Sequence, residues 1–539
     1  MKIIKVFFYL LIIGYTGYFI SSCNHPDKAL GTGIAEDYLN FPPELRPQTP
    51  YDVDTALEHR LQQAGKFAET QRIFEVLSWQ MFISLNWPVD STGAYLPDIN
   101  DKGSRTWESW KESYEVFKED GSSPRPWGSS TDLPEELLNK ANVNAHKEIL
   151  FRTSKFPAFE EDKWKRNSKH RDINITEDEV DQAFTAPIWD QSGNIIRYEI
   201  RLNKPTVDYI VTNELFNIDG QVTFSNQLKK VSFPAGNRQL AGAIELKFAW
   251  KIMVPGKDFE ERYFTKAVQI LDENKQLKDV VVGLVGMHIG TKTVSSPQWI
   301  WATFEQVDNL ETNALEKVHG QYLRPSFYNP DSGTSPINLL PDSSVKPLKN
   351  QVQRVLPIPV ATQQLNSQVQ ALLKKKNSYW QYYQLIGTQW PTDPSSPAYP
   401  LNAATYQLPD AVTNKSGGKP TPVYLTNMIM ETYFQGGTIV GDTKATSAYN
   451  KYIANEPAYF QIEGGPSNVD TANTRKIIFG TEGCVSCHSS ASIAIGDTIV
   501  KGVRTPKFGP PRIGDFEWLL QRKAHFKTPV KIVSPSSTK

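Results

Sequence analysis

Two cysteines and a histidine lie close together near the C-terminal end of the chain, in the run Cys484-Val485-Ser486-Cys487-His488. Two residues separate the thiols, and the imidazole directly follows the second thiol. This spacing lets the thiols form thioethers to the two vinyl groups of one haem, while the adjacent histidine ligates the iron from the same side. The motif therefore predicts one covalently bound haem c, attached through Cys484 and Cys487, with His488 as an axial iron ligand.

Other uses of a Cys-x-x-Cys pair fit the chain less well. A redox-active dithiol needs a βαβ setting and a thiol of low pKa at a helix start, and neither is evident around Cys484. A structural zinc site needs four ligands, and the chain has only three cysteines. A disulfide between Cys484 and Cys487 remains an alternative, but it would give His488 no role.

The first 22 residues have the pattern of an export signal. Lys2 and Lys5 precede an almost unbroken apolar run that ends at Ile20 and is too short for a membrane span. The sequence Ile20-Ser21-Ser22-Cys23 resembles the lipobox of bacterial lipoproteins, which implies cleavage before Cys23 and lipidation of that residue. The alternative is an ordinary cleavage site in a periplasmic protein without lipid.

Export and haem attachment predict the same compartment, because bacteria attach haem covalently outside the cytoplasm. We therefore expect a protein on the periplasmic side of a bacterial membrane, in the outer membrane or cell envelope, held by a lipid anchor. The 58 basic and 58 acidic residues balance, so nothing favours a nucleic-acid partner.

Periodicity indicates the fold of the remaining chain. Apolar residues recur at helical spacing over residues 54–85, and an aromatic stripe from Trp107 to Phe117 predicts a second helix. Strict alternation between residues 243 and 254 predicts a strand, and similar segments follow up to residue 310. The expected fold class is α+β, with N-terminal helices packed on a largely antiparallel sheet or sandwich, followed by a small, mainly α haem domain.

Composition shifts divide this fold into segments. The Pro- and Ser-rich stretch 391–422 predicts a linker, and residues 23–50 resemble a tether. The predicted organisation is a signal peptide at 1–22, the tether at 23–50, an α+β domain at 51–390 with its sheet at about 187–310, the linker at 391–422, and the haem domain at 423–539.

The haem segment is similar to small c-type cytochromes. Residues 475–483 run into Cys484 as the approach to the haem motif does in that family, with Phe479 at the usual aromatic position. The segment Gly509-Pro510-Pro511-Arg512-Ile513-Gly514 resembles the Gly-Pro segment whose carbonyl orients the axial histidine there. The resemblance implies a mainly α haem domain. The stretches 85–88 and 298–309 also resemble exported bacterial proteins of the cytochrome c family.

The chain departs from that family at the sixth iron ligand. Small cytochromes c usually supply a methionine downstream of the motif, and no methionine follows His488. Met430, on a predicted helix at 425–434, is the first candidate, and His525, on a predicted helix at 515–526, is the second. His288 or another group is a third possibility, and an open coordination site is the fourth.

The ligand set determines the expected function. A closed iron favours a membrane-anchored mono-haem cytochrome that passes electrons to a redox partner protein. The rival is a haem-dependent oxidoreductase, peroxidase-like or a substrate dehydrogenase, whose substrate binds the N-terminal part, because one haem domain needs only about 100 residues. A third class is a ligand-binding module with the haem as a sensor.

Overall fold

The computed structural model describes most of the chain between residues 37 and 527. The described residues are 37–129, 137, 143, 147–150, 187–272, 276–310, 316–329, 338, 341, 344–354, 358–391, 427–432, 484, 488, 491–500, 502–510 and 513–527. Contacts divide the chain after Asn40 into two compact units. All elements below belong to the unit that starts at Phe41, except the short 3-10 helix η1 (Asp37–Leu39).

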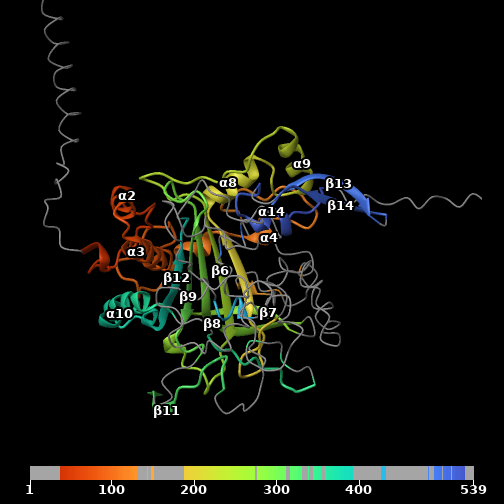
Figure 1. Cartoon of the computed structure of the whole chain (residues 1–539). Helices are drawn as coiled ribbons and strands as arrows, with labels where there is room; N and C mark the ends of the chain where they lie inside the picture. Colours follow the sequence, from red (N-terminus) through yellow and green to blue (C-terminus); the bar gives the residue numbers. More distant parts are fainter. Residues whose placement is uncertain are drawn as a thin grey trace, which may run out of the picture. The chain divides into compact units, whose positions relative to one another are not determined.

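One large, mostly antiparallel sheet organises the described part of this unit (Figure 1). Its main path runs, in spatial order, through β12 (Tyr383–Gln389), β9 (Ile300–Gln306), β8 (Leu277–Thr291), β6 (Ile244–Ile252), β5 (Arg197–Leu202) and β3 (Lys111–Glu112). Strand β7 (Thr265–Leu271) also pairs with β8, and β4 (Ile149–Leu150) joins β7 as the parallel pair. The predicted class of α and β elements with a largely antiparallel sheet is confirmed.

Helices and small hairpins surround this sheet. The α-helices are α2 (Thr55–Gln63), α3 (Phe67–Leu85), α4 (Ser113–Val116), α8 (Lys204–Thr212), α9 (Ile218–Asn226), α10 (Val360–Lys375) and α14 (Trp518–Arg522). The other 3-10 helices are η2 (Thr106–Ser109), η3 (Glu260–Arg262) and η4 (Tyr379–Tyr382). The two-stranded pairs are β1 (Pro88–Val89) with β2 (Ser104–Arg105), β10 (Lys317–Val318) with β11 (Gln321–Tyr322), and β13 (Ala494–Val500) with β14 (Val503–Phe508).

The predicted helix over residues 54–85 is two helices. Gly65 has φ of +70° directly after α2, and the amide of Lys66 donates to the carbonyl of Leu61 at 2.8 Å. A left-handed residue just past the helix end closes the last turn and turns the chain aside. The new direction lets α3 start at Phe67 and bury most of its length.

The helix predicted from the aromatic stripe at Trp107–Phe117 is wrong. The stripe spans η2, β3 and α4, because Lys111 and Glu112 pair with β5 at the edge of the sheet. Trp107 is fully buried and packs on Phe248 with 4.2 Å between ring centroids. The aromatic spacing therefore came from tertiary packing and not from one helical face.

Different segments of the chain pack on the two faces of the sheet. Phe82 of α3 stacks on Phe304 of β9 with centroids 4.3 Å apart, and Trp79 donates to Asn366 of α10 at 2.9 Å, so these helices cover one face. His488 packs on Trp301 of β9 on the other face, so C-terminal segments reach the sheet there. Among the described residues, no helix is long and apolar enough to cross a membrane.

Candidate functional site

Cys484 and His488 lie four residues apart in the sequence, and the backbone of each is helical. Both are partly buried, and Cys484 packs against a core cluster that includes Phe216, Trp299 and Leu519. The two residues of the haem motif that the structure describes therefore lie at the edge of one apolar core. Cys487 and the predicted lipidation site Cys23 lie outside the described residues.

One backbone carbonyl fixes the tautomer of His488. The Nδ1 atom of His488 lies 2.7 Å from the carbonyl oxygen of Phe516. A carbonyl can only accept a hydrogen bond, so Nδ1 must carry the proton. The neutral ring then has its lone pair on Nε2, which is the form that binds a metal.

The ring of His488 is also fixed by packing. Its centroid lies 4.0 Å from that of Trp301, with 42° between the planes. Trp301 in turn stacks on Trp299 at 5.8 Å. A histidine held by a carbonyl and an aromatic ring is already oriented before any ligand binds.

The carbonyl that contacts His488 depends on an unusual backbone. Asp515 and Phe516 have φ of 52° and 67°, which cost energy in residues with a Cβ. Surrounding contacts hold this turn: the Asp515 carboxylate accepts from the amide of Phe233 at 2.6 Å and from Lys292 at 2.5 Å. The Asp515 carbonyl accepts from the indole of Trp299 at 3.1 Å.

This arrangement corrects the predicted role of the segment Gly509–Gly514. The carbonyl of Gly509 accepts from the hydroxyl of Ser492 at 2.9 Å, whereas the carbonyl that meets His488 belongs to Phe516. The orienting group therefore comes from just beyond the Gly-Pro segment, in the turn before α14.

Glycines on β8 make room for the groups on this face of the sheet. Gly286, His288 and Gly290 alternate along β8 and so share one face. A Cβ at Gly290 would lie 3.0 Å from the ring of Trp301, which pairs with it across the strands. The absence of a Cβ at Gly290 thus lets the Trp301 ring lie across β8, where it packs on His488.

Met430 contacts the same face at another position. Its Cε atom lies 3.3 Å from the position of a Cβ at Gly286, inside a buried cluster with Tyr198 and Phe327. Gly286 and Gly290 are four residues apart, which is about 13 Å along a strand. Residues 427–432 form turns and not a regular helix. The described structure therefore does not bring Met430 next to the packed pair His488 and Trp301.

The other two candidate ligands occupy different surroundings. His288 lies on β8 between these two positions, and its Nε2 is 3.1 Å from a carboxylate oxygen of Glu431. His525 follows α14 and forms a β-bridge with Asn217, away from β8. Burial lowers the pKa of His525. On the face that carries Trp301, His288 is thus the candidate at the strand position nearest Gly290.

A pair of buried carboxyl groups lies on the same face. Glu245 is opposite Gly290 in the register, and Glu517 is the N-cap of α14. Both are buried, and the Oε2 atom of each has no hydrogen-bond partner among the described residues. Burial and the Glu245 carboxyl raise the pKa of Glu517 well above its usual range, and Lys247 opposes the shift.

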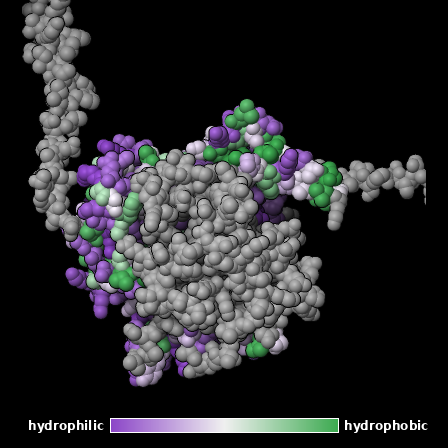
Figure 2. Space-filling view, in the orientation of Figure 1, coloured by the Kyte–Doolittle hydropathy of each residue, from purple (hydrophilic) through white to green (hydrophobic). Residues whose placement is uncertain are grey.

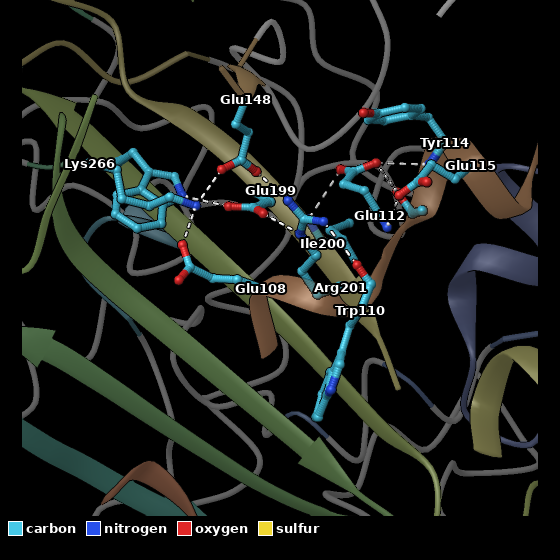
Figure 3. Close-up of polar contacts among 12 residues, drawn as sticks. Glu108, Trp110, Glu112, Tyr114, Glu115, Glu148, Glu199, Ile200, Arg201 and Lys266 are labelled. Carbon is cyan, nitrogen blue, oxygen red and sulfur yellow. Dashed lines mark hydrogen bonds and ion pairs between the residues drawn. The ribbon is translucent and has the colours of Figure 1, made fainter. Parts of the chain in front are cut away.

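Sequence reasoning missed this carboxyl pair and also missed a second cluster of charges on β5. Figure 3 shows Arg201 and Lys266 between carboxylates: Glu148 binds both cations, Glu199 binds Arg201, and Glu108 lies 2.8 Å from Lys266. The alternation of charges in residues 197–201 inside a buried strand was the available signal.

Burial sets unequal pKa values within the β5 cluster. Burial and the Glu148 carboxylate raise the pKa of Glu199 to about 8, against the effect of Arg201. The pKa of Glu148 stays far below its usual range despite its burial, because Lys266 and Arg201 stabilise its charge. These contacts make the cluster an ion-pair network. Among the described residues, no group of three or more His, Cys, Asp or Glu side chains could hold a metal ion.

Comparisons with known proteins give no family for the chain: no family model matches, and no similar sequence or fold is found among the curated proteins or the solved structures. The function must therefore be argued from the residues of the site themselves.

Proposed function

We propose that the chain is a mono-haem c-type cytochrome that carries electrons on the periplasmic side of a bacterial membrane, anchored through a lipid on Cys23. The observation that carries this proposal is the hydrogen bond from Nδ1 of His488 to the carbonyl of Phe516, which in the neutral ring places the lone pair on Nε2, four residues after Cys484. A histidine prepared for a metal is what the Cys-x-x-Cys-His motif requires.

The residues present fit the group that the motif implies. Cys484 and Cys487 would hold a haem through thioethers, His488 would ligate its iron, and the bound haem would supply a one-electron couple. Trp301 supports the histidine ring from the sheet, and Phe516 supports it from the turn before α14. In the finer fold that we propose, residues 423–539 act as the haem-binding part and residues 51–390 as the body on which it packs.

Covalent haem is the direct test. The full chain, produced with haem-maturation machinery, should retain haem after denaturation and show one reversible redox couple. Cys484→Ala together with Cys487→Ala should abolish retention, whereas Cys23→Ser should keep the haem and lose only the lipid. Absence of covalent haem in the unaltered chain would refute the proposal.

The pair of His288 and Glu431 favours a second candidate function, a haem-dependent oxidoreductase. A carboxylate beside one imidazole nitrogen orients the ring, and an oriented imidazole suits a proton acceptor near a reacting ligand. Both side chains keep some exposure, at 18% and 17%. An electron carrier should leave the haem spectrum unchanged on adding carbon monoxide or peroxide. A spectrum that changes on adding peroxide, and that changes more slowly in His288→Ala, would favour the oxidoreductase.

A further inference from the structure

The turn that ends α9 exposes a leucine in a strained conformation. Leu228 has φ of 56° and is 91% exposed. Glycine is the usual residue at the left-handed position just past a helix end, because a Cβ there costs energy. The amide of Leu228 donates to the carbonyl of Ser225 at 2.9 Å, so the turn is closed. The chain therefore presents an apolar side chain to solvent at a position where glycine would fold more easily.

Two more exposed aliphatic side chains lie at the same end of the sheet. Leu240 is 67% exposed, four residues before β6, and Val294 is 69% exposed, three residues after β8. The first residue of β6 pairs with the last residue of β8, and the carbonyl of Lys292 lies so close to Gly242 that no Cβ would fit there. The two segments are thus packed together. Strand β5 also ends opposite the start of β6 and leads into α8 and α9.

Exposed cations accompany these aliphatic side chains. The segment 227–241, which joins α9 to β6, contains three basic residues and no acidic residue, whereas the whole chain has 58 of each. Lys229 and Lys230 directly follow the first exposed leucine, and Arg238 lies two residues before the second. All three are exposed, and none forms an ion pair with a described residue. The cations are therefore available to an anionic surface.

Other charges at this end of the sheet are already neutralised. Three neighbouring cations are each paired with a carboxylate: Lys292 with Asp515, Arg504 with Asp219, and Lys204 with Asp208. Glu214 is exposed, but it lies beside Gly220 and so near the other end of α9 from Leu228. The charge that remains unpaired beside the two exposed leucines is therefore positive.

We propose that this surface, formed by Leu228, Lys229, Lys230, Arg238, Leu240 and Val294, binds an anionic lipid bilayer, as a membrane contact independent of Cys23. At the α9 end of the molecule, Figure 2 shows hydrophobic and hydrophilic atoms exposed side by side. Aliphatic side chains flanked by lysine and arginine match the boundary between acyl chains and anionic headgroups.

A protein partner fits this surface less well. Protein interfaces are depleted in lysine and enriched in aromatic residues. Two of the three cations here are lysines, and Phe233, the aromatic residue of the segment 227–241, is buried. The composition thus favours a lipid surface.

The bilayer would lie at the same end of the sheet as the haem motif. Strand β9 also starts at this end, since its first residue pairs with the last residue of β8. Trp301 is the second residue of β9 and packs on His488. Binding of this surface would therefore hold the motif near the membrane.

Amide hydrogen exchange on the full chain tests the proposal without depending on haem, and it reads each segment separately. Exchange is measured in buffer, with phosphatidylcholine vesicles, and with vesicles that also contain phosphatidylglycerol. The amides of residues 228–230 and 238–240 should exchange roughly tenfold more slowly with the anionic vesicles than in buffer. High salt should reduce this protection, because it screens exposed charges.

Leu228→Gly separates membrane binding from folding. Glycine suits φ of 56°, so denaturant unfolding should show a variant no less stable than the unaltered chain. The lipid concentration needed for half-maximal protection should nevertheless rise about tenfold, because one buried aliphatic side chain is lost. Lys229→Gln together with Lys230→Gln should raise it about 25-fold, since each lysine near an anionic surface contributes a factor of about five.

The matched control is Val360→Ser. Val360 is 62% exposed but lies on α10, which packs on α3, so this variant should need the same lipid concentration as the unaltered chain. Equal exchange in buffer and with anionic vesicles would overturn the proposal, and so would protection that Leu228→Gly leaves intact. Protection that needs membrane proteins reconstituted in phosphatidylcholine, and is absent with pure anionic lipid, would overturn it in favour of a protein partner.

Discussion

The Nδ1 atom of His488 lies 2.7 Å from the carbonyl oxygen of Phe516, so a turn in the C-terminal segment determines which nitrogen of this imidazole can bind a metal. That turn is held mainly by Asp515, whose contacts with Phe233 and Lys292 join residues more than 200 positions apart. The orientation of the histidine thus depends on the assembly of the whole unit.

Asp515→Ala should destabilise the protein strongly. It leaves Lys292 buried without its carboxylate and removes the acceptor of the Phe233 amide. Breaking a buried ion pair in this way costs about 3–5 kcal/mol. Denaturant unfolding measures the loss. The control is Asp98→Ala, because Asp98 pairs with Lys376 at the same 2.5 Å but in solvent, where a pair contributes about 0–1 kcal/mol. Equal losses in the two variants would contradict this account.

Gly290→Ala should displace Trp301. The new Cβ would lie 3.0 Å from the indole ring, which has to shift together with His488. Overpacking of this kind costs about 1–3 kcal/mol, measurable by thermal or denaturant unfolding with tryptophan fluorescence as a local probe. Gly496→Ala is the control, because a Cβ there meets nothing within 4 Å. An unchanged stability and fluorescence in Gly290→Ala would show that the glycine is not needed for this packing.

The sequence predicted those features that depend on neighbouring residues along the chain. The alternation of apolar and polar residues predicted β6 to within two residues at each end, at 243–254 against the observed 244–252. This worked because the alternation lies within the strand itself. The Phe516 carbonyl was missed because Asp515 and Phe516 adopt positive φ only through distant contacts. The charge cluster on β5 was missed because Glu148 and Lys266, which complete it, come from separate segments.

The unfolding free energy should fall as pH rises because of Glu199. Its folded pKa of about 8 lies above the usual glutamate value of 4.5, so its protonated form favours the folded state. That contribution is complete below about pH 4.5 and is lost as pH rises through 8. Glu199→Gln mimics the protonated form, and denaturant unfolding from pH 5 to 9 should show a flatter profile.

Glu148→Gln should have the opposite effect on stability. The carboxylate of Glu148 has a lowered pKa, since Lys266 and Arg201 stabilise its charge, so its contribution is present above its unfolded pKa and lost in acid. The variant should therefore be less stable than the unaltered chain at pH 7. If Glu199→Gln and Glu148→Gln changed the unfolding free energy in the same direction, the assignment of a protonated Glu199 and an ionised Glu148 would be refuted.

Met430→Ala should destabilise the fold without changing the optical spectrum of the proposed haem. Met430 fills a cluster about 13 Å along β8 from the position of Trp301 and His488, and its truncation costs about 2–5 kcal/mol. Optical spectra of the oxidised protein, recorded beside denaturant unfolding, separate the two effects. Loss of the far-red band of methionine-ligated haem in this variant would instead establish Met430 as the sixth ligand.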